Sequence, residues 1–351
     1  MNAIALEPEQ VTAERIAGHV LCTDIVGVGA SGRTHLHKGH VLAAQDADIL
    51  RTYGAEIHLL QLDSGDVHED VASGRLARAI AGDGLKMSGP VESQTNLRAT
   101  FRGLLEVNAA VVRKINLLPD MSVYTLYDGQ PVLQGKKVAA AKVTPLAVPE
   151  GVLSEAERTA AAGFPVVRVR PFLQQPVGVV VRDRLRDRPR QRFEEALHRK
   201  IGWFSSPLAG IRYVPDDVDA IVLAINELLR EGVCLLLAAG VNSTDPLDLT
   251  VQAVQRVGAH AEKRGVPAHP GSTCWLASIG DVPVFGLALC GMFSRTTVLD
   301  LLLPRFLSGR PVHAEDLAAL GHGGMLGKEM AFRFPAYEAV DQSEDRGNAS
   351  K

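Results

Sequence analysis

Hydrophobic and polar positions along this chain of 351 residues change their pattern near residue 165. Before that point, short apolar runs alternate with turns that contain glycine and aspartate, which is typical of a β-rich region. The clearest runs are Val20–Val26, Ile57–Leu62, Leu104–Val107 and Lys137–Val143. Helical patterns are interspersed at Asp70–Ile80 and Ala43–Tyr53. Residues 1–165 are therefore predicted to form a β-rich α+β N-terminal region.

From Val177 onward, strand patterns alternate with helix patterns, which predicts a parallel or mostly parallel sheet with helices on both faces. The strongest helix is Asp216–Arg230, where apolar residues recur on one helical face and Gly232 follows the end. Strands are predicted at Val177–Val181, Val233–Ala238 and Val282–Leu287. Further helices are predicted at Pro189–Lys200, Leu249–Val257, Thr273–Ile279 and Arg295–Leu307. The fold class is thus α/β, with a three-layer αβα domain over residues 166–327 and a polar tail over 328–351 that is expected to be disordered.

Composition and charge narrow the function classes. The formal charge of -3 gives no general attraction to nucleic acid or to an acidic membrane. No run approaches the roughly 18 apolar residues that mark a membrane helix, and the first 20 residues are too acidic for a secretory signal. The four cysteines are far apart in the sequence, so we expect neither a zinc site nor a disulfide framework and favour a reduced, cytoplasmic setting.

The first candidate binding residues lie in the loop that follows a predicted buried strand. The run Val233–Ala238 leads into a loop of small and polar residues that ends at Asp248. Gly240 allows a tight turn or the close approach of a ligand. Asn242, Ser243 and Thr244 add short polar groups, and the carboxylates of Asp245 and Asp248 are oxygen ligands of the type that Mg²⁺ prefers.

Three segments in a fixed order carry a family resemblance. They are Gly240-Val-Asn-Ser-Thr-Asp-Pro-Leu-Asp248, His269-Pro-Gly-Ser-Thr273 and Val282-Pro-Val-Phe-Gly-Leu-Ala-Leu-Cys-Gly-Met-Phe-Ser294. Together they resemble the pterin-binding domain of the molybdopterin molybdenumtransferases and their relatives. In that family, a Gly-Gly-x-Ser loop that ends in Asp and a Pro-Gly-Asn-like turn hold the pterin, its phosphate and a metal ion.

The resemblance implies a site at the carboxyl ends of the strands, where ligands of parallel α/β sheets collect. The turn of Pro270, Gly271, Ser272 and Thr273 is expected to open a helix whose free N–H groups and dipole bind the phosphate. Ser294 and Arg295, at the mouth of the last loop, are further candidates for contact with an anionic ligand.

This chain departs from the family pattern after the first strand. The family motif Thr-Gly-Asn/Asp-Glu is replaced by Val181-Arg182-Asp183-Arg184, so the glutamate is missing, and the double glycine is reduced to Ala239-Gly240. Arginine occupies every second position from Arg182 to Arg192. In an extended segment this period places the arginines on one side, where Arg182 and Arg184 can contact phosphate or molybdate. A solvated loop with local ion pairs is the favoured interpretation.

Each feature also has a purely structural interpretation. Asp248 can simply cap the next helix, since aspartate is a favoured N-cap, and the Pro-Gly-Ser turn is common in proteins. His35, His37 and His40, with His68-Glu69-Asp70, can supply imidazole and carboxylate ligands for a transition metal. Surface histidines are the favoured interpretation there.

The resemblance implies that the protein binds molybdopterin or adenylyl-molybdopterin and takes part in molybdenum cofactor biosynthesis. As a transferase it would use Asp248 as the catalytic residue, with Mg²⁺ on Asp248 and Asp245 and molybdate as the oxyanion. Two alternatives remain: a non-catalytic carrier that passes the cofactor to a molybdoenzyme, and a regulatory protein that binds a nucleotide or another phosphate compound. A homodimer is expected from the resemblance alone.

Overall fold

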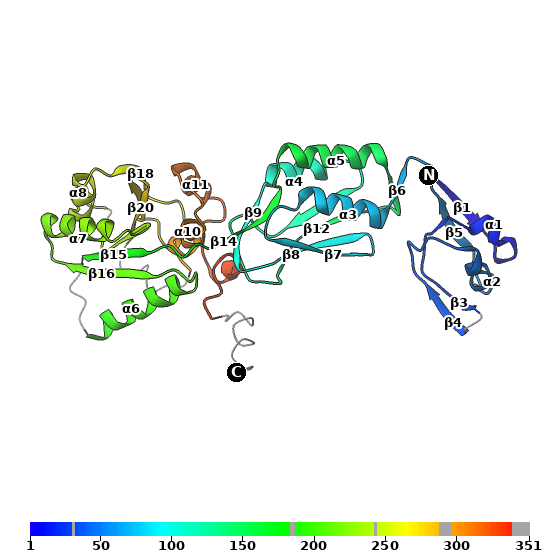
Figure 1. Cartoon of the computed structure of the whole chain (residues 1–351), viewed down its shortest axis with the longest axis horizontal. Helices are drawn as coiled ribbons and strands as arrows, with labels where there is room; N and C mark the ends of the chain where they lie inside the picture. The colour runs from blue at the N-terminus through cyan, green and yellow to red at the C-terminus, as the bar shows by residue number, and fades with distance from the viewer. Residues whose placement is uncertain (30–31, 183–186, 242–243, 288–295, 339–351) are drawn as a thin grey trace. The chain divides into compact units, whose positions relative to one another are not determined.

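The computed structural model describes residues 1–29, 32–182, 187–241, 244–287 and 296–338 (Figure 1). The chain divides into two compact units, which we call unit 1 and unit 2. Unit 1 comprises Met1–Thr100, Leu105–Asp128 and Gly135–Val169; unit 2 comprises Phe101–Leu104, Gly129–Gln134 and Arg170–Lys351. Within the described ranges, no helix combines the length and the apolar character that a membrane crossing requires.

The first part of unit 1 contains two small antiparallel sheets, one in the order β1-β5-β2 and one a hairpin of β3 and β4. The strands are Asn2–Leu6 (β1), Val20–Leu21 (β2), Ile25–Gly29 (β3), Gly32–Leu36 (β4) and Ile57–Gln61 (β5). The helices are Pro8–Gln10 (η1), Ala13–Ile16 (α1), Ala44–Asp46 (η2) and Ala47–Arg51 (α2). Buried side chains of these elements, including Ile16, Leu50 and Leu59, form one core. The predicted run Val20–Val26 is therefore divided between two strands of different sheets.

The second part of unit 1 is a four-stranded sheet in the order β10-β12-β8-β7, against which α3 packs. Its strands are Leu85–Val91 (β7), Gln94–Ala99 (β8), Met121–Thr125 (β10) and Lys137–Val143 (β12). The helices are Glu69–Ile80 (α3), Ala109–Asn116 (α4) and Glu150–Ala162 (α5), and the pair Asp66–His68 (β6) and Ala147–Pro149 (β13) adds a short ladder. Thr95, Leu97 and Ala99 are buried at every second position of β8, as one covered face requires.

Unit 2 is built on a six-stranded sheet in the order β16-β15-β17-β20-β19-β18. The strands are Val177–Arg182 (β15), Leu208–Val214 (β16), Leu235–Ala239 (β17), His260–Arg264 (β18), Trp275–Ile279 (β19) and Val282–Leu287 (β20). The strands β16, β15, β17 and β20 run parallel to one another. β19 pairs antiparallel with β20, and β18 pairs antiparallel with β19. The sheet is therefore mixed, and the predicted parallel order describes its first four strands. Short strands lie at Gly103–Val107 (β9), Pro131–Val132 (β11) and Val167–Pro171 (β14).

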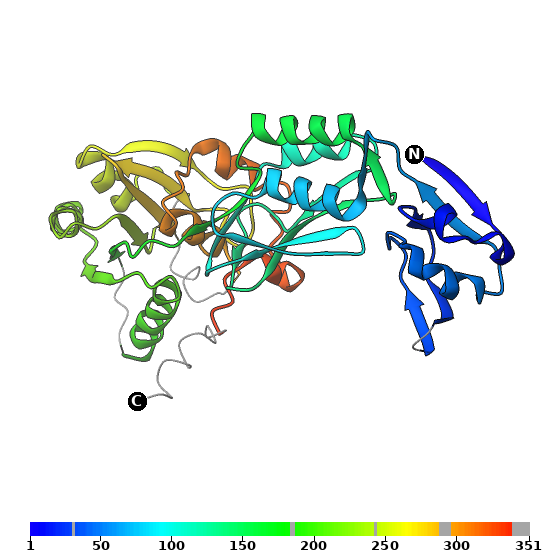
Figure 2. The same cartoon turned by 45° about the vertical axis from the view of Figure 1, so that its right-hand side comes forward.

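Helices cover both faces of the unit 2 sheet (Figure 1 and Figure 2). Val177, Val179 and Val181 of β15 belong to one core cluster, which includes buried residues of α6 (Asp187–Gly202) and α10 (Val298–Leu307). Val180 belongs to the other cluster, which is shared with α7 (Val218–Arg230) and α8 (Leu249–Arg256). Strands that are buried on both faces in this way carry nearly continuous apolar sequence, which explains why they are readable from sequence.

The predicted helix Thr273–Ile279 is wrong, because this segment is strand β19, paired antiparallel with β20. Ile279 pairs with Val282, so Gly280 and Asp281 form a two-residue hairpin turn, and Gly280 has φ of +56°. A short apolar run cannot be assigned to helix or strand by periodicity alone, and the glycine-containing pair before the next strand is the signal that identifies the hairpin.

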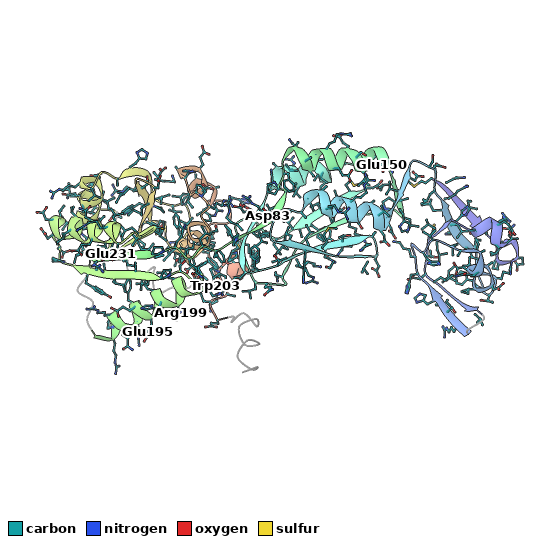
Figure 3. All side chains as sticks on the ribbon, in the orientation of Figure 1. Asp83, Glu150, Glu195, Arg199, Trp203 and Glu231 are labelled. Atoms are coloured by element: carbon teal, nitrogen blue, oxygen red, sulfur yellow. The ribbon has the colours of Figure 1, made fainter. Side chains whose placement is uncertain are left out.

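The disorder expected from residue 328 onward is wrong for residues 328–338. Lys328–Arg333 forms a 3₁₀ helix (η3) after the short helix Ala314–Ala319 (α11). Phe334 is 6% exposed and belongs to the unit 2 core. Trp203 lies directly after α6 (Figure 3). Its indole N–H donates to the carbonyl of Ala336 over 3.0 Å, and its ring meets Tyr337 edge-on. Residues 328–338 are thus folded against unit 2.

Candidate functional site at the carboxyl edge of the sheet

The loops that carry the sequence motifs meet at one edge of the unit 2 sheet. β15, β17 and β20 are parallel, so the loops that follow them leave from the same edge. β19 is antiparallel to β20, and Trp275 at its start pairs with Gly286 near the end of β20. The turn that precedes β19 therefore lies at this edge too. Segments Gly240–Asp248 and Pro270–Thr273 share it although they are far apart in sequence.

Gly240 occupies a position that only glycine fits without strain. Its φ is +88°, a conformation that side chains with a Cβ rarely adopt. A Cβ at this position would lie 2.3 Å from the carbonyl oxygen of Arg182. The close approach of the chain after β17 to the end of β15 thus depends on this glycine.

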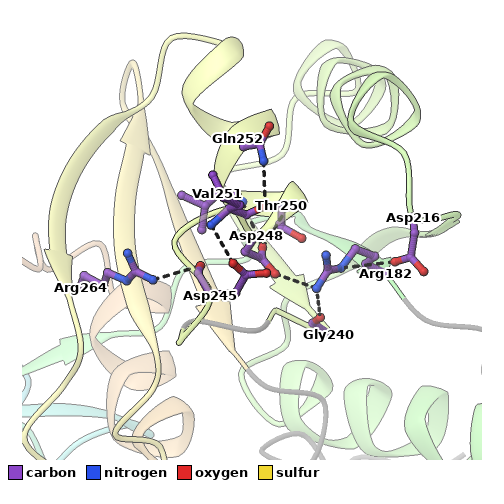
Figure 4. A network of polar contacts seen from close by, with 10 residues as sticks. Arg182, Asp216, Gly240, Asp245, Asp248, Thr250, Val251, Gln252 and Arg264 are labelled. Carbon is purple, nitrogen blue, oxygen red and sulfur yellow. Dashed lines mark hydrogen bonds and ion pairs between the residues drawn. The ribbon is translucent and has the colours of Figure 1, made fainter.

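Asp248 is the N-cap of α8, as its structural interpretation suggested. One carboxylate oxygen, Oδ1, accepts hydrogen bonds from the backbone N–H groups of Thr250 (2.9 Å) and Val251 (3.2 Å). The other, Oδ2, lies 2.7 Å from Nη2 of Arg182, with the Asp248 side chain 0% exposed (Figure 4). Both oxygens of this carboxylate are therefore engaged by protein donors.

Arg182 ties the end of β15 to the loop after β17. Its Nη2 also donates to the carbonyl of Gly240 over 3.0 Å, and its Nε lies 3.8 Å from Oδ1 of Asp216. The side chain is 14% exposed. A guanidinium that pairs with a buried carboxylate in this manner compensates its charge.

Asp245, the second predicted metal ligand, is exposed at the same edge. Its Oδ1 accepts from the N–H of Leu247 over 2.8 Å, and its backbone carbonyl accepts from Nη2 of Arg264 over 3.2 Å (Figure 4). Among the described residues, neither Asp245 nor Asp248 belongs to a group of three metal-type ligands. The role of both as Mg²⁺ ligands remains a prediction.

The turn at Pro270–Thr273 does not open a helix, so the predicted helix N-terminus is wrong, and phosphate binding by this turn stays a prediction. Gly271 has φ of +121°, and a Cβ on it would lie 2.7 Å from side-chain atoms of Val298. The N–H of Val298 in turn donates to the carbonyl of Pro270 over 3.1 Å. Ser272 and Thr273 are exposed and lead into β19.

The extended arrangement predicted for the arginine series is wrong for Arg188, Arg190 and Arg192, because these residues lie on α6, which begins at Asp187. Arg190, on this helix, pairs with Glu194 over 2.9 Å and lies 4.1 Å above the ring of Tyr213. Local ion pairing, the favoured interpretation, describes Arg190 well. Five predicted site residues lie outside the described residues: Arg184, Asn242, Ser243, Ser294 and Arg295.

Sequence reasoning named Arg182 and Asp248 separately and missed that they pair. It also missed Arg264 and Asp216, which border the same network. The available signal was the position of Arg182 at the end of a buried strand, where a charged side chain needs a partner. That partner cannot be chosen from sequence, because Asp216 and Asp217 follow one neighbouring strand and Asp245 and Asp248 follow the other.

Comparisons with known proteins give distant structural likenesses only. No protein-family model matches the chain, and no curated protein matches it. A molybdopterin biosynthesis MoeA protein from Pyrococcus horikosii is similar at 14% identity and a TM-score of 0.29, over 88% of this chain and 76% of that one. A protein from Corynebacterium diphtheriae, provisionally assigned to molybdenum cofactor biosynthesis, is similar at 16% identity and a TM-score of 0.26, over 41% and 97%.

A third structure, of MogA, is similar at 17% identity and a TM-score of 0.26, over 39% of this chain and 100% of that one. All three TM-scores lie below 0.5, so none of these likenesses supports a function for this chain.

Proposed function

We propose that this protein binds molybdopterin or adenylyl-molybdopterin at the carboxyl edge of the unit 2 sheet and acts in molybdenum cofactor biosynthesis as a carrier. The observation that carries the proposal is the meeting of Gly240–Asp248 and Pro270–Thr273 at one sheet edge. These are the segments in which the sequence resembles the pterin-binding domain. A site assembled from distant loops at this edge is the usual arrangement in α/β folds.

The exposed groups at this edge suit a phosphorylated heterocycle. Thr244, Ser272 and Thr273 are exposed, and their hydroxyl groups can donate hydrogen bonds to phosphate oxygens. Gly240 and Gly271 hold the two turns in conformations with positive φ that keep the backbone close to the sheet. Arg264 adds a positive charge beside the first loop.

A carrier is favoured over a molybdate-inserting enzyme because of the state of Asp248. For Mg²⁺ to bind this carboxylate, it must displace the guanidinium of Arg182 or the two capping N–H groups. Removing one partner of a buried ion pair costs about 3–5 kcal/mol. Arg182 stands where the family has its Thr-Gly-Asn/Asp-Glu motif, so the replacement both removes the glutamate and neutralises the loop aspartate.

Pterin binding is tested by incubating the purified full chain with molybdopterin, removing free ligand and oxidising with iodine to the fluorescent pterin derivative. We expect retention by the wild type and loss in Ser272→Glu/Thr273→Glu, because two carboxylates repel the phosphate. Both positions are exposed, so folding should be unaffected. The matched control is Leu223→Glu on α7, a residue 57% exposed, which should retain the pterin. Equal retention in all three proteins, or none in the wild type, contradicts the proposal.

The carrier is distinguished from the enzyme by its metal dependence. A chain preloaded with the finished cofactor should reconstitute an apo-molybdoenzyme equally well with and without a Mg²⁺ chelator. A chain that inserts molybdate should instead need Mg²⁺ and molybdate, and should lose its activity in Asp248→Asn. If the Mg²⁺ chelator abolishes reconstitution of the apo-molybdoenzyme by the preloaded chain, the protein is an enzyme and the carrier proposal is wrong.

A further inference from the structure

The hairpin of β3 and β4 in unit 1 places two histidines and one aspartate together. Ile25 pairs with Leu36, so Asp24, just before β3, lies opposite His37, just after β4. His35 and His37 flank Leu36 and point to the same face, as the strand period of two requires. Leu36 is buried, whereas the other three are exposed. The two imidazole rings lie with their centroids 4.1 Å apart.

The ligand atoms of these side chains converge. Oδ1 of Asp24 lies 3.6 Å from Nδ1 of His37 and 4.0 Å from Nε2 of His35, and all three ligand atoms lie within 4.8 Å of one another. Ligands about 2.0–2.1 Å from a tetrahedral metal ion are about 3.4 Å apart. Small rotations of three exposed side chains are enough to close the difference.

The carboxylate of Asp24 is held in place by the backbone of the turn after β4. The backbone N–H of Lys38 donates to Oδ1 of Asp24 over 2.8 Å. The geometry of the carboxylate is thus set by the turn after β4.

A second observation comes from the cavity that these residues border, which has a volume of about 680 Å³. Glu69, at the start of α3, lines it and is only 2% exposed. Its Oε2 is buried and has no hydrogen-bond partner, and Oδ1 of the neighbouring Asp70 is in the same state. Unpaired buried carboxylate oxygens are rare in folded proteins and indicate a water or ion that completes the site.

The charges around the cavity favour a cation. Four carboxylates line it, Asp24, Glu69, Asp70 and Glu92, against the two lysines Lys38 and Lys142. Lys142 directs its ammonium group to the carbonyl of Glu92 (2.7 Å) and the hydroxyl of Ser93 (2.8 Å). The ammonium group of Lys142 is therefore bound to Glu92, which lines the cavity, and to Ser93.

The other histidines of the predicted cluster have different partners. Nε2 of His40 lies 2.9 Å from Oδ2 of Asp46. His68 caps α3 by accepting from the N–H of Asp70, and its Nε2 donates to the carbonyl of Gly39 over 2.8 Å. Two of the four histidines singled out in the sequence, His35 and His37, thus lie next to the same carboxylate, that of Asp24, which sequence reasoning did not name.

We propose that Asp24, His35 and His37 bind one first-row transition-metal dication, with Glu69 supplying negative charge from the wall of the same cavity. Two imidazoles and one carboxylate suit Zn²⁺, Co²⁺ or Ni²⁺ rather than Mg²⁺ or Ca²⁺. Three protein ligands on an open face leave coordination positions for water or for a second molecule in the cavity. The site belongs to unit 1 and does not depend on the pterin proposal.

The test is a titration of the metal-free full chain with Zn²⁺ by calorimetry, repeated with Co²⁺ to record the visible absorption of the bound ion. His35→Gln and His37→Gln should each lower the Zn²⁺ affinity about tenfold or more and should weaken the Co²⁺ spectrum. The matched control is His58→Gln, since His58 is an exposed histidine paired with one carboxylate, Glu56, over 3.1 Å. It should bind as the wild type does.

Glu69→Gln tests the contribution of the cavity wall, and we expect a severalfold loss of Zn²⁺ affinity with the Co²⁺ spectrum unchanged in shape. Circular dichroism confirms that each variant is folded. The site assignment is overturned if the wild type binds no Zn²⁺ beyond His35→Gln/His37→Gln, or if His58→Gln loses as much affinity as those variants. Unaltered affinity in Glu69→Gln overturns the contribution of Glu69.

Discussion

The pairing of Arg182 with Asp248 can be tested by replacing Arg182 with Met. The change removes the guanidinium 2.7 Å from a carboxylate whose side chain is 0% exposed. Loss of one partner from a buried pair costs about 3–5 kcal/mol. Asp248 keeps its two hydrogen bonds from Thr250 and Val251, and Arg182 is partly exposed, so we expect the free energy of unfolding to fall by about 2–3 kcal/mol.

The reverse change, Asp248→Asn, should cost less. Asparagine is also a good N-cap, so the start of α8 stays capped. The guanidinium keeps the carbonyl of Gly240 as an acceptor, and it lies partly in solvent. We expect a loss of about 1–2 kcal/mol, the value of one charged hydrogen bond.

The double variant completes a thermodynamic cycle, and we expect a coupling energy of about 1.5 kcal/mol or more between the two side chains. Urea unfolding followed by tryptophan fluorescence is the appropriate assay, because the chain has 2 tryptophans and both Trp203 and Trp275 lie in unit 2. A coupling energy within about 0.5 kcal/mol of zero would refute the pairing. Mg²⁺ should also raise the midpoint of Arg182→Met but not that of the wild type, if the arginine occupies the place of a metal.

Three further predictions concern the rest of the chain. Lys200→Met should lower the stability of unit 2 by about 3–5 kcal/mol in the same fluorescence assay, because it leaves Asp300, 0% exposed, without its ammonium partner. The pKa of Glu150 is lowered to about 2 from an ordinary value of 4.5 by its hydrogen bonds to Arg75, so the stability that this pair adds is present above pH 4.5 and is lost as the pH falls toward 2. The difference in stability between the wild type and Arg75→Met, measured by circular dichroism, should therefore become smaller as the pH falls over this range. A difference in stability that stays constant would contradict the pairing. Gly271→Ala should destabilise the chain by about 1–3 kcal/mol, because φ is +121° there, and an unchanged urea midpoint would contradict the backbone conformation.

Much of the secondary structure was predictable, because buried strands and amphipathic helices carry strong local signals. Lys137–Val143 and Val282–Leu287 have the predicted bounds, and the helix predicted at Asp216–Arg230 begins two residues later, after its cap Asp217. The segment Thr273–Ile279 was mistaken for a helix because its apolar run fits both periods. The segment instead forms a hairpin with β20, and the sequence signal for that hairpin is the turn at Gly280.

The site residues were less predictable, since their roles depend on partners that are distant in sequence. Asp248 is predictable as a possible ligand and as a possible cap. The structure shows the cap, and it adds an ion pair with Arg182, 66 residues away. Asp24 went unnoticed beside the histidines, because only the antiparallel register of β3 and β4 brings it opposite His37. Hydrophobic patterns predict where helices and strands form. Which charged side chains lie next to each other depends on how those helices and strands pack and pair.

The central claim, that two distant turns form one pterin site, is tested most directly by amide hydrogen exchange of the full chain with and without molybdopterin. The account predicts slower exchange in residues 240–248 and 270–274 together on binding, and no change in unit 1. Protection of one turn alone, or protection confined to other segments of the chain, would contradict it.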